Sequence, residues 1–136
     1  MSSFHPEMSL QEVNRISMLG LAHVGDGVYV LLTRTYLCAQ GHTDVQKLHR
    51  LTVARVRAEA QAKAAHRILP LLTEEEAALY RRGRNAHVNS VPHNAALADY
   101  HAATGLEALF GWLYLQGHLE RIDTLFAAIT EDDHAA

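Results

Sequence analysis

Two carboxylates stand in the most apolar parts of this sequence and could carry out chemistry. Asp26 lies between Gly25 and Gly27 in the nearly apolar residues 19–32, and Glu107 is the one acid in residues 104–117. Helices this apolar should be buried on nearly every side. Burying an unpaired charge is costly, so each acid must be neutral, paired, bound to a metal or open to water. Each acid is therefore expected to have a partner elsewhere in the chain.

The two acids could be partners of each other if their helices meet. Such a pair can hold Mg²⁺, which often takes only one or two protein carboxylates. A cation held there would activate water and stabilise the leaving oxygen in phosphodiester hydrolysis. An alternative with about equal weight, from the residues alone, is that each acid pairs with a buried arginine or histidine.

The spacing of apolar residues and the capping residues predict the elements that position these acids. Ser9 with Glu12, and Thr73 with Glu76, form capping boxes, and Thr43 or Asp44 can cap another helix. No window alternates with period two, so the predicted class is all-α. The predicted helices cover residues 9–38, 44–70, 73–84, 105–116 and 119–129, with a loop over 85–94 and short helical turns over 95–101.

The composition fits one globular domain over residues 1–136, with 49% apolar and 20% charged residues. A lone cysteine, Cys38, excludes an internal disulfide and fits a reducing cytoplasm. The first residues lack the pattern of a secretory signal, and the apolar run 16–32 is interrupted by His23 and Asp26. We therefore expect no membrane association.

The charge is unevenly distributed. The whole chain carries −3, yet nine of the twelve basic residues lie between Lys47 and Arg84, where only four acids occur. That segment is thus 9 − 4 = +5 and could meet an anion that the whole protein would repel.

Four segments resemble the catalytic domain of the ribonuclease III family, specifically its small Mini-III branch. They are Gly25-Asp26, the RRGRNA run at 81–86, the PHN run at 92–94 and the TGLEALFGWLYL run at 104–115. They stand in family order, and the similar region covers about residues 19–121. The resemblance implies an all-helical homodimer that cleaves double-stranded RNA with Mg²⁺, for which Mn²⁺ is a substitute. Each protomer would cut one strand and leave 5′-phosphate and 3′-hydroxyl ends.

The same resemblance implies maturation of precursor 23S ribosomal RNA in the bacterial cytoplasm, with a ribosomal protein as a candidate further partner. It assigns Asp26 and Glu107 as the catalytic metal ligands. Other acids of full-length ribonuclease III fall here at Leu19, Ala22 and Thr104, a reduction that the Mini-III branch shares. The remaining metal contacts would come from water, phosphate or backbone, with the Thr104 hydroxyl as a further candidate.

The candidate RNA-binding residues are polar or basic, which suits contacts to phosphates and 2′-hydroxyls. Their competing interpretation is a solvated surface or, for the arginines, favourable placement at a helix C-terminus. They are Arg81, Arg82, Arg84, Asn85, His87, His93, Asn94, Lys47 and Arg50.

Histidines stand at 87, 93 and 101, where Mini-III relatives commonly have basic residues. Only protonated histidine attracts phosphate, so RNA affinity should weaken as pH rises through the histidine range. Binding without cleavage, measured from mildly acidic to alkaline pH, tests this, and a flat profile would contradict it.

Two rival functions remain open at the sequence level. One is a catalytically idle RNA- or ribosome-binding protein on the same fold, which retention of both acids disfavours. The other is a structural helical dimer whose acids are salt-bridged. A zinc site is disfavoured because the chain has one cysteine and no compact ligand cluster.

Overall fold

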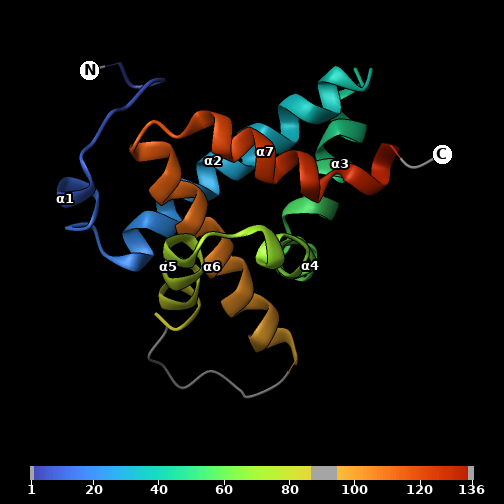
Figure 1. Cartoon of the computed structure of the whole chain (residues 1–136). Helices are drawn as coiled ribbons and strands as arrows, with labels where there is room; N and C mark the ends of the chain where they lie inside the picture. Colours follow the sequence, from blue (N-terminus) through green and yellow to red (C-terminus); the bar gives the residue numbers. More distant parts are fainter. Residues whose placement is uncertain (1, 87–94, 135–136) are drawn as a thin grey trace.

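Figure 1 shows the computed structural model, which describes residues 2–86 and 95–134. Apart from an isolated bridge between Ser2 and His5, these residues hold no β-structure, which confirms the predicted all-α class. The elements are α1 (Leu10–Val13), α2 (Met18–Ala39), α3 (Val45–Val56), α4 (Ala58–Ile68), η1 (Leu69–Leu71), α5 (Glu74–Arg84), α6 (Ala95–Leu115), α7 (Leu119–Ile129) and η2 (Glu131–His134).

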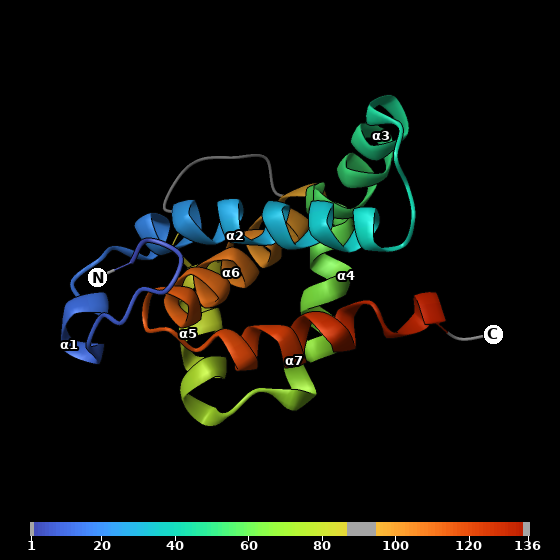
Figure 2. The ribbon, with the colours of Figure 1, turned by 90° about the horizontal axis from the view of Figure 1, so that it is seen from above.

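Helix α6 is the centre of the fold, with α2, α4, α5 and α7 packed around it (Figures 1 and 2). Its Leu106, Leu109 and Phe110 are fully buried, and so are Leu21 of α2 and Leu125 of α7. Burying a side chain of this size contributes about 1.5–3 kcal/mol, so this cluster supplies much of the core. The neighbours on several sides explain why the α6 sequence is apolar nearly all round.

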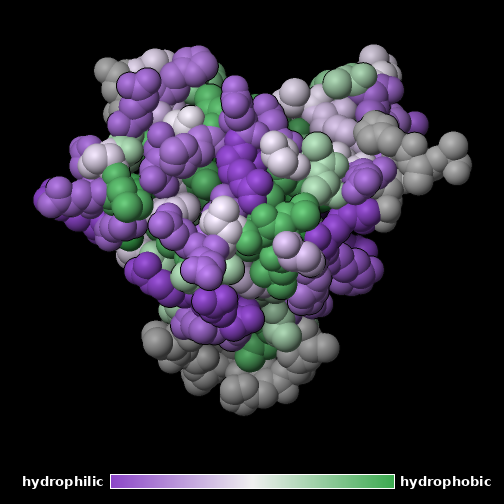
Figure 3. Space-filling model, in the orientation of Figure 1, coloured by the Kyte–Doolittle hydropathy of each residue, from purple (hydrophilic) through white to green (hydrophobic). Residues whose placement is uncertain are grey.

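Helix α2 differs from α6, because only one of its faces is buried in the single chain. Leu21, Tyr29 and Leu37 face the core, whereas Leu19 and Leu31 are 47% and 57% exposed. The prediction of burial on nearly every side is therefore wrong for α2 within one protomer. None of the helices in the described residues is long and apolar enough to cross a membrane. The face in Figure 3 is mostly hydrophilic, with hydrophobic residues in separate patches.

The predicted helix starts are confirmed where a side chain caps the backbone. Ser9 and Glu12 form a reciprocal capping box at α1, and Thr73 and Glu76 form one at α5. Of the two candidates before α3, Asp44 is the cap, since its carboxylate accepts from the Lys47 backbone N–H at 2.9 Å.

Two predicted long helices are in fact interrupted. The first ends at Val13, and α2 begins only after Ser17, whose hydroxyl accepts from the Gly20 backbone N–H at 3.0 Å. The second breaks at Arg57, which is extended (φ −65°, ψ 154°) and separates α3 from α4. The break lets α4 turn back and pack along α6.

In the C-terminal half, the sequence predicted a break between two helical segments where the structure has a single helix. The turns at 95–101 and the helix at 105–116 were predicted as separate, but they form one helix, α6. Gly105 does not break it. An added Cβ at Gly105 would lie 2.8 Å from the Tyr80 carbonyl oxygen, so this glycine serves close packing of α5 on α6.

Candidate active site

The two acids are brought together by a close crossing of α2 and α6. A Cβ added to Gly25 would overlap the carbonyl oxygen of Glu107, and one added to Gly111 would overlap the carbonyl oxygen of Leu21. The backbones therefore touch at this point, which only residues without a side chain allow. Since Asp26 follows Gly25, the crossing places the Asp26 and Glu107 side chains side by side. Gly27 has no neighbour within 4 Å and plays no part in it.

The environments of the two carboxylates differ. Asp26 is exposed to solvent, whereas Glu107 is partly buried between the helices. Burial, followed by hydrogen bonding to Asp26 and the Asp26 charge, raises the pKa of Glu107 to about 7, although a hydrogen bond from Gln61 acts in the opposite direction. A carboxyl group beside another carboxylate is expected to hold its proton in this way. The pair is thus an electrostatically strained site that a cation would relieve.

Gln61 of α4 is a site residue that the sequence interpretation missed. Its side-chain Nε2 donates to Oε2 of Glu107 at 3.3 Å and to the Val56 carbonyl oxygen at 2.8 Å. The signal that could have found it is a polar residue on the apolar face of an alanine-rich helix, beside the buried Ala64, Ala65 and Ile68.

The donor set fits a hard divalent cation. Asp26 and Glu107 offer carboxylate oxygens, and the Gln61 Oε1 is the one buried side-chain polar atom without a partner in the described part of the chain. Oxygen donors of this kind suit Mg²⁺, which commonly keeps several waters. No group of three or more His, Cys, Asp or Glu gathers for a metal among residues 2–86 and 95–134, so any cation would rely on two acids, water and substrate.

The salt-bridge alternative is not observed. The ion pairs in the described residues link Arg55 to Asp133, Lys63 to Glu59, and Arg121 to Glu76, and none includes Asp26 or Glu107. Among residues 2–86 and 95–134, no cationic side chain forms an ion pair with either acid, which disfavours a purely structural role for them.

The basic end of α5 lies against the turn of α6 that carries Glu107. An added Cβ at Gly83 would lie 2.7 Å from the Ala108 Cβ and 3.2 Å from the Gly105 Cα, so the two helices are in close contact there. The structure therefore brings the arginines around Gly83 to the same part of α6 as the acid pair.

The side chains in this turn are available for contacts. Arg81 and Arg82 are exposed, while the Arg84 guanidinium lies 5.9 Å from the Tyr80 ring centroid. Asn85 is exposed and its Oδ1 lies 3.5 Å from the Arg84 Nε. At this distance the Arg84 guanidinium is within the range of a cation–π contact with Tyr80.

Lys47 and Arg50 are also exposed, but the structure does not bring them to the acid pair. They belong to α3, which packs on the distal half of α2 and projects from the body of the molecule in Figure 2. Arg34 and Cys38 of α2 line a hollow with α3, and at 1.5 Å per residue Cys38 lies about 18 Å along the axis from Asp26.

Some candidates cannot be placed. His87, His93 and Asn94 lie outside the described residues.

Two further candidates are placed by the structure. His101 is partly buried, with its ring centroid 6.3 Å from that of Tyr100. The Thr104 hydroxyl donates to the Tyr100 carbonyl oxygen at 3.0 Å, so it is engaged with the backbone of its own helix.

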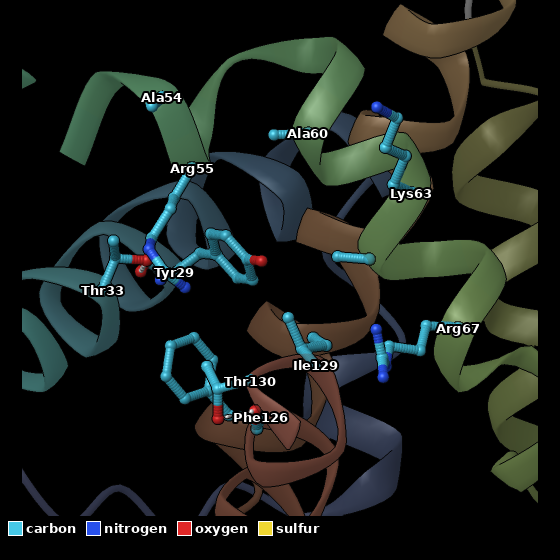
Figure 4. Close-up of a pocket in the computed structure, with 11 residues that line it drawn as sticks. Tyr29, Thr33, Ala54, Arg55, Ala60, Lys63, Arg67, Phe126, Ile129 and Thr130 are labelled. Carbon is cyan, nitrogen blue, oxygen red and sulfur yellow. Dashed lines mark hydrogen bonds between the residues drawn. The ribbon is translucent and has the colours of Figure 1, made fainter. Parts of the chain in front are cut away.

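A cavity of about 200 Å³ is lined by residues of α2, α3, α4 and α7 (Figure 4). Tyr29, Arg55, Arg67 and Phe126 contribute to its lining, and Asp26, Gln61 and Glu107 do not. Burial raises the pKa of Tyr29, with a smaller contribution from the Glu107 charge. The cavity therefore neighbours the acid pair without being part of it.

Comparison with known proteins identifies the family of this chain. The Ribonuclease III domain family matches residues 19–118, which include both acids. The chain is 44% identical over 118 residues to a Mini-ribonuclease 3 of Thermoanaerobacter sp., covering 87% of this chain and 83% of that protein. It is 42% identical over 113 residues to a Mini-ribonuclease 3 of Symbiobacterium thermophilum, covering 83% and 87%.

A solved structure agrees with the fold. The crystal structure of a protein from Fusobacterium nucleatum superposes with a TM-score of 0.76 and 28% identity, over 86% of this chain and 93% of that one. The helical arrangement described above is therefore that of a known structure.

Proposed function

Since this chain belongs to the ribonuclease III family and is an endoribonuclease, we propose that it hydrolyses double-stranded RNA with Mg²⁺ held by Asp26 and Glu107. The observation that carries the proposal is the acid pair at the crossing of α2 and α6, inside the matched region. Mn²⁺ should substitute, because it accepts the same oxygen donors.

Each group in the site has a defined role in this proposal. Asp26 and Glu107 would hold the cation, for which Glu107 would have to give up its proton. When bound, the cation would supply activation of water and stabilisation of the leaving oxygen. In the hydrolysis, the water oxygen forms a bond to phosphorus as the bond from phosphorus to the 3′ oxygen breaks. One water proton ends on that 3′ oxygen as the hydroxyl, the other is released to solvent, and the phosphate stays on the 5′ end of the other product.

Basic and polar side chains would hold the RNA. Arg81, Arg82, Arg84 and Asn85 follow one another beside the acid-bearing turn of α6, so they would contact the phosphates nearest the cleaved bond. Lys47 and Arg50 on the projecting α3 would bind the duplex further along. His87, His93 and Asn94 complete the proposed RNA contacts.

A second copy of the chain fits the exposed face of α2. An apolar groove of about 470 Å³ lies over α2 and α7, lined by Val24, Val28, Leu31 and Leu32 among others. Exposed apolar surface of this kind marks an interaction site. In a homodimer each protomer would cut one strand and give staggered ends.

The substrate proposed is precursor 23S ribosomal RNA in the bacterial cytoplasm, the role that the resemblance to the Mini-III branch implies, with a ribosomal protein as a candidate partner. The matched relatives are bacterial proteins, which supports the bacterial setting.

A cleavage assay tests the proposal. The wild-type protein should cut a perfect RNA duplex in Mg²⁺, leave the matching single strand intact and stop on addition of EDTA. Asp26→Asn and Glu107→Gln should each lower kcat by at least about 10²-fold, since each removes a metal ligand. Glu120→Gln, which neutralises an exposed acid on α7, is the matched control and should keep wild-type activity.

Other outcomes would support the rivals. Duplex binding without any cleavage would indicate an idle RNA-binding protein. A helical dimer with neither binding nor cleavage would indicate a structural role.

A further inference from the structure

Gln61 occupies an unusual position for an amide. It is only 2% exposed, on the face of α4 that packs against α6. Its NH₂ group has two acceptors, the Val56 backbone carbonyl and the Glu107 carboxylate, while its Oε1 is buried without a partner among the described residues. One side chain therefore ties the partly buried acid of the active site to the junction of α3 and α4.

The orientation of this amide follows from chemistry. Exchanging its nitrogen and oxygen would set Oε1 against the Val56 carbonyl oxygen, now 2.8 Å from Nε2, and neither of these two oxygens can donate. The NH₂ group must therefore face Glu107, and Oε1 must remain the free acceptor.

This arrangement makes the folded state less stable than an apolar side chain of similar volume would. A buried acceptor without a donor costs about 1–3 kcal/mol, and methionine would fill a similar volume without that penalty. Buried polar groups left unsatisfied in native proteins call for an explanation, and a role at the acid pair provides one.

We propose that Gln61 is a positioning residue of the metal site. Its N–H groups fix the Glu107 carboxylate against the backbone of the α3–α4 junction, and its Oε1 accepts a hydrogen bond from a water that the cation holds. This inference rests on the proposed function, because it requires a cation at Asp26 and Glu107. Partners that orient metal ligands in this way typically change metal affinity or activity 10–100-fold when removed.

The test compares Gln61→Met with Thr33→Val. Thr33 is a buried polar residue on α2 whose hydroxyl donates only to its own helix, at the Tyr29 carbonyl, so its replacement removes a buried polar group away from the acids. Mn²⁺ is titrated into each RNA-free protein, and free Mn²⁺ is followed by electron paramagnetic resonance. Gln61→Met should bind Mn²⁺ about tenfold more weakly than wild type, and Thr33→Val should match wild type within about twofold.

Activity provides a second readout that a merely structural role would not produce. The Mg²⁺ concentration for half-maximal cleavage should rise about tenfold in Gln61→Met, while kcat at saturating Mg²⁺ stays within a few-fold of wild type. Unchanged Mn²⁺ affinity and an unchanged Mg²⁺ requirement in folded Gln61→Met would overturn the proposal.

A measurement on the wild-type protein covers the case in which Gln61→Met does not fold. On addition of Mg²⁺, NMR should show shifts of the Gln61 side-chain amide signals together with the carboxyl carbon signals of Asp26 and Glu107. Carboxyl shifts without an amide shift would overturn the role of Gln61 and leave the metal site standing. No shift at either acid would instead contradict the proposed function.

Discussion

At the level of single residues, Glu107 is a proposed metal ligand whose partly buried position carries an energetic penalty. Burial and the neighbouring Asp26 raise the pKa of Glu107 to about 7, against 4.5 for an ordinary glutamate. In the metal-free folded protein this carboxyl keeps its proton at a pH where the unfolded chain has released it. A bound cation would remove the cost of ionising Glu107 beside Asp26, because it favours the charged form of both acids.

The first prediction follows from this pKa. The folded state binds the extra proton, so the free energy of unfolding should fall as pH rises from about 4.5 to about 7 and remain lower above it. The loss should be about 1–2 kcal/mol after discounting for solvent screening of the partly exposed group. Urea unfolding in EDTA at pH 5 and pH 8 measures it.

The comparison with Glu107→Gln isolates this residue from the ten histidines. The variant should lack that part of the pH dependence and be more stable than wild type at pH 8. Equal pH dependence in the two proteins would contradict the prediction, and Glu120→Gln should behave as wild type.

At the scale of the elements, the crossing of α2 and α6 sets the distance between the acids. An added Cβ at Gly25 meets the backbone of Glu107, whereas one at Gly27 meets nothing. The second prediction is that Gly25→Ala lowers the free energy of unfolding by about 2–3 kcal/mol through overpacking and abolishes cleavage.

Gly27→Ala is the matched control on the same helix. It should raise the free energy of unfolding by about 0.5–1 kcal/mol, because alanine favours the helix over glycine. Gly27 lines the apolar groove proposed for the dimer, so urea unfolding compares the two variants, and duplex cleavage is measured for Gly25→Ala against wild type. A Gly25→Ala protein as stable as wild type would show that the helices do not need this contact.

Some boundaries of the helices could be predicted from the sequence alone, and others could not. Capping is local, so the starts at Ser9, Asp44 and Thr73 could be predicted from a few neighbouring residues. Two other features depend on packing between helices, which cannot be predicted from a few neighbouring residues. They are the break at Arg57 and the continuity of α6 through Gly105.

The candidate site also has residues that the sequence predicts and contacts that it does not. Asp26 and Glu107 could be predicted as candidates because a charge in an apolar helix is conspicuous. Their contact depends on the close approach at Gly25. Gln61 carries no charge, and its contact with Glu107 depends on the packing of α4, which the sequence does not contain.

In the whole molecule, the uneven charge of the sequence can be assigned to particular helices. The +5 segment from Lys47 to Arg84 forms α3, α4 and α5, so an anionic duplex can meet positive charge although the chain as a whole is negative. Electrostatic attraction of this kind weakens as salt rises.

The third prediction concerns the proposed dimer. Leu31 is 57% exposed and lines the groove on α2, so Leu31→Glu should convert the protein to a monomer by placing a charge in the apolar interface. Leu71→Glu alters a leucine that is 49% exposed on η1, outside the groove, and should leave the oligomeric state unchanged. Sedimentation equilibrium measures both, and an unaltered mass for Leu31→Glu would contradict this interface.

The proposed site requires Asp26 and Glu107 to share one divalent cation. Anomalous scattering of Mn²⁺ in crystals of the protein tests this, with crystals of Glu107→Gln as the comparison. We expect an anomalous peak within coordination distance of both carboxylates, and its loss in the variant. A wild-type map with no peak there, or with Mn²⁺ bound only elsewhere, would contradict it.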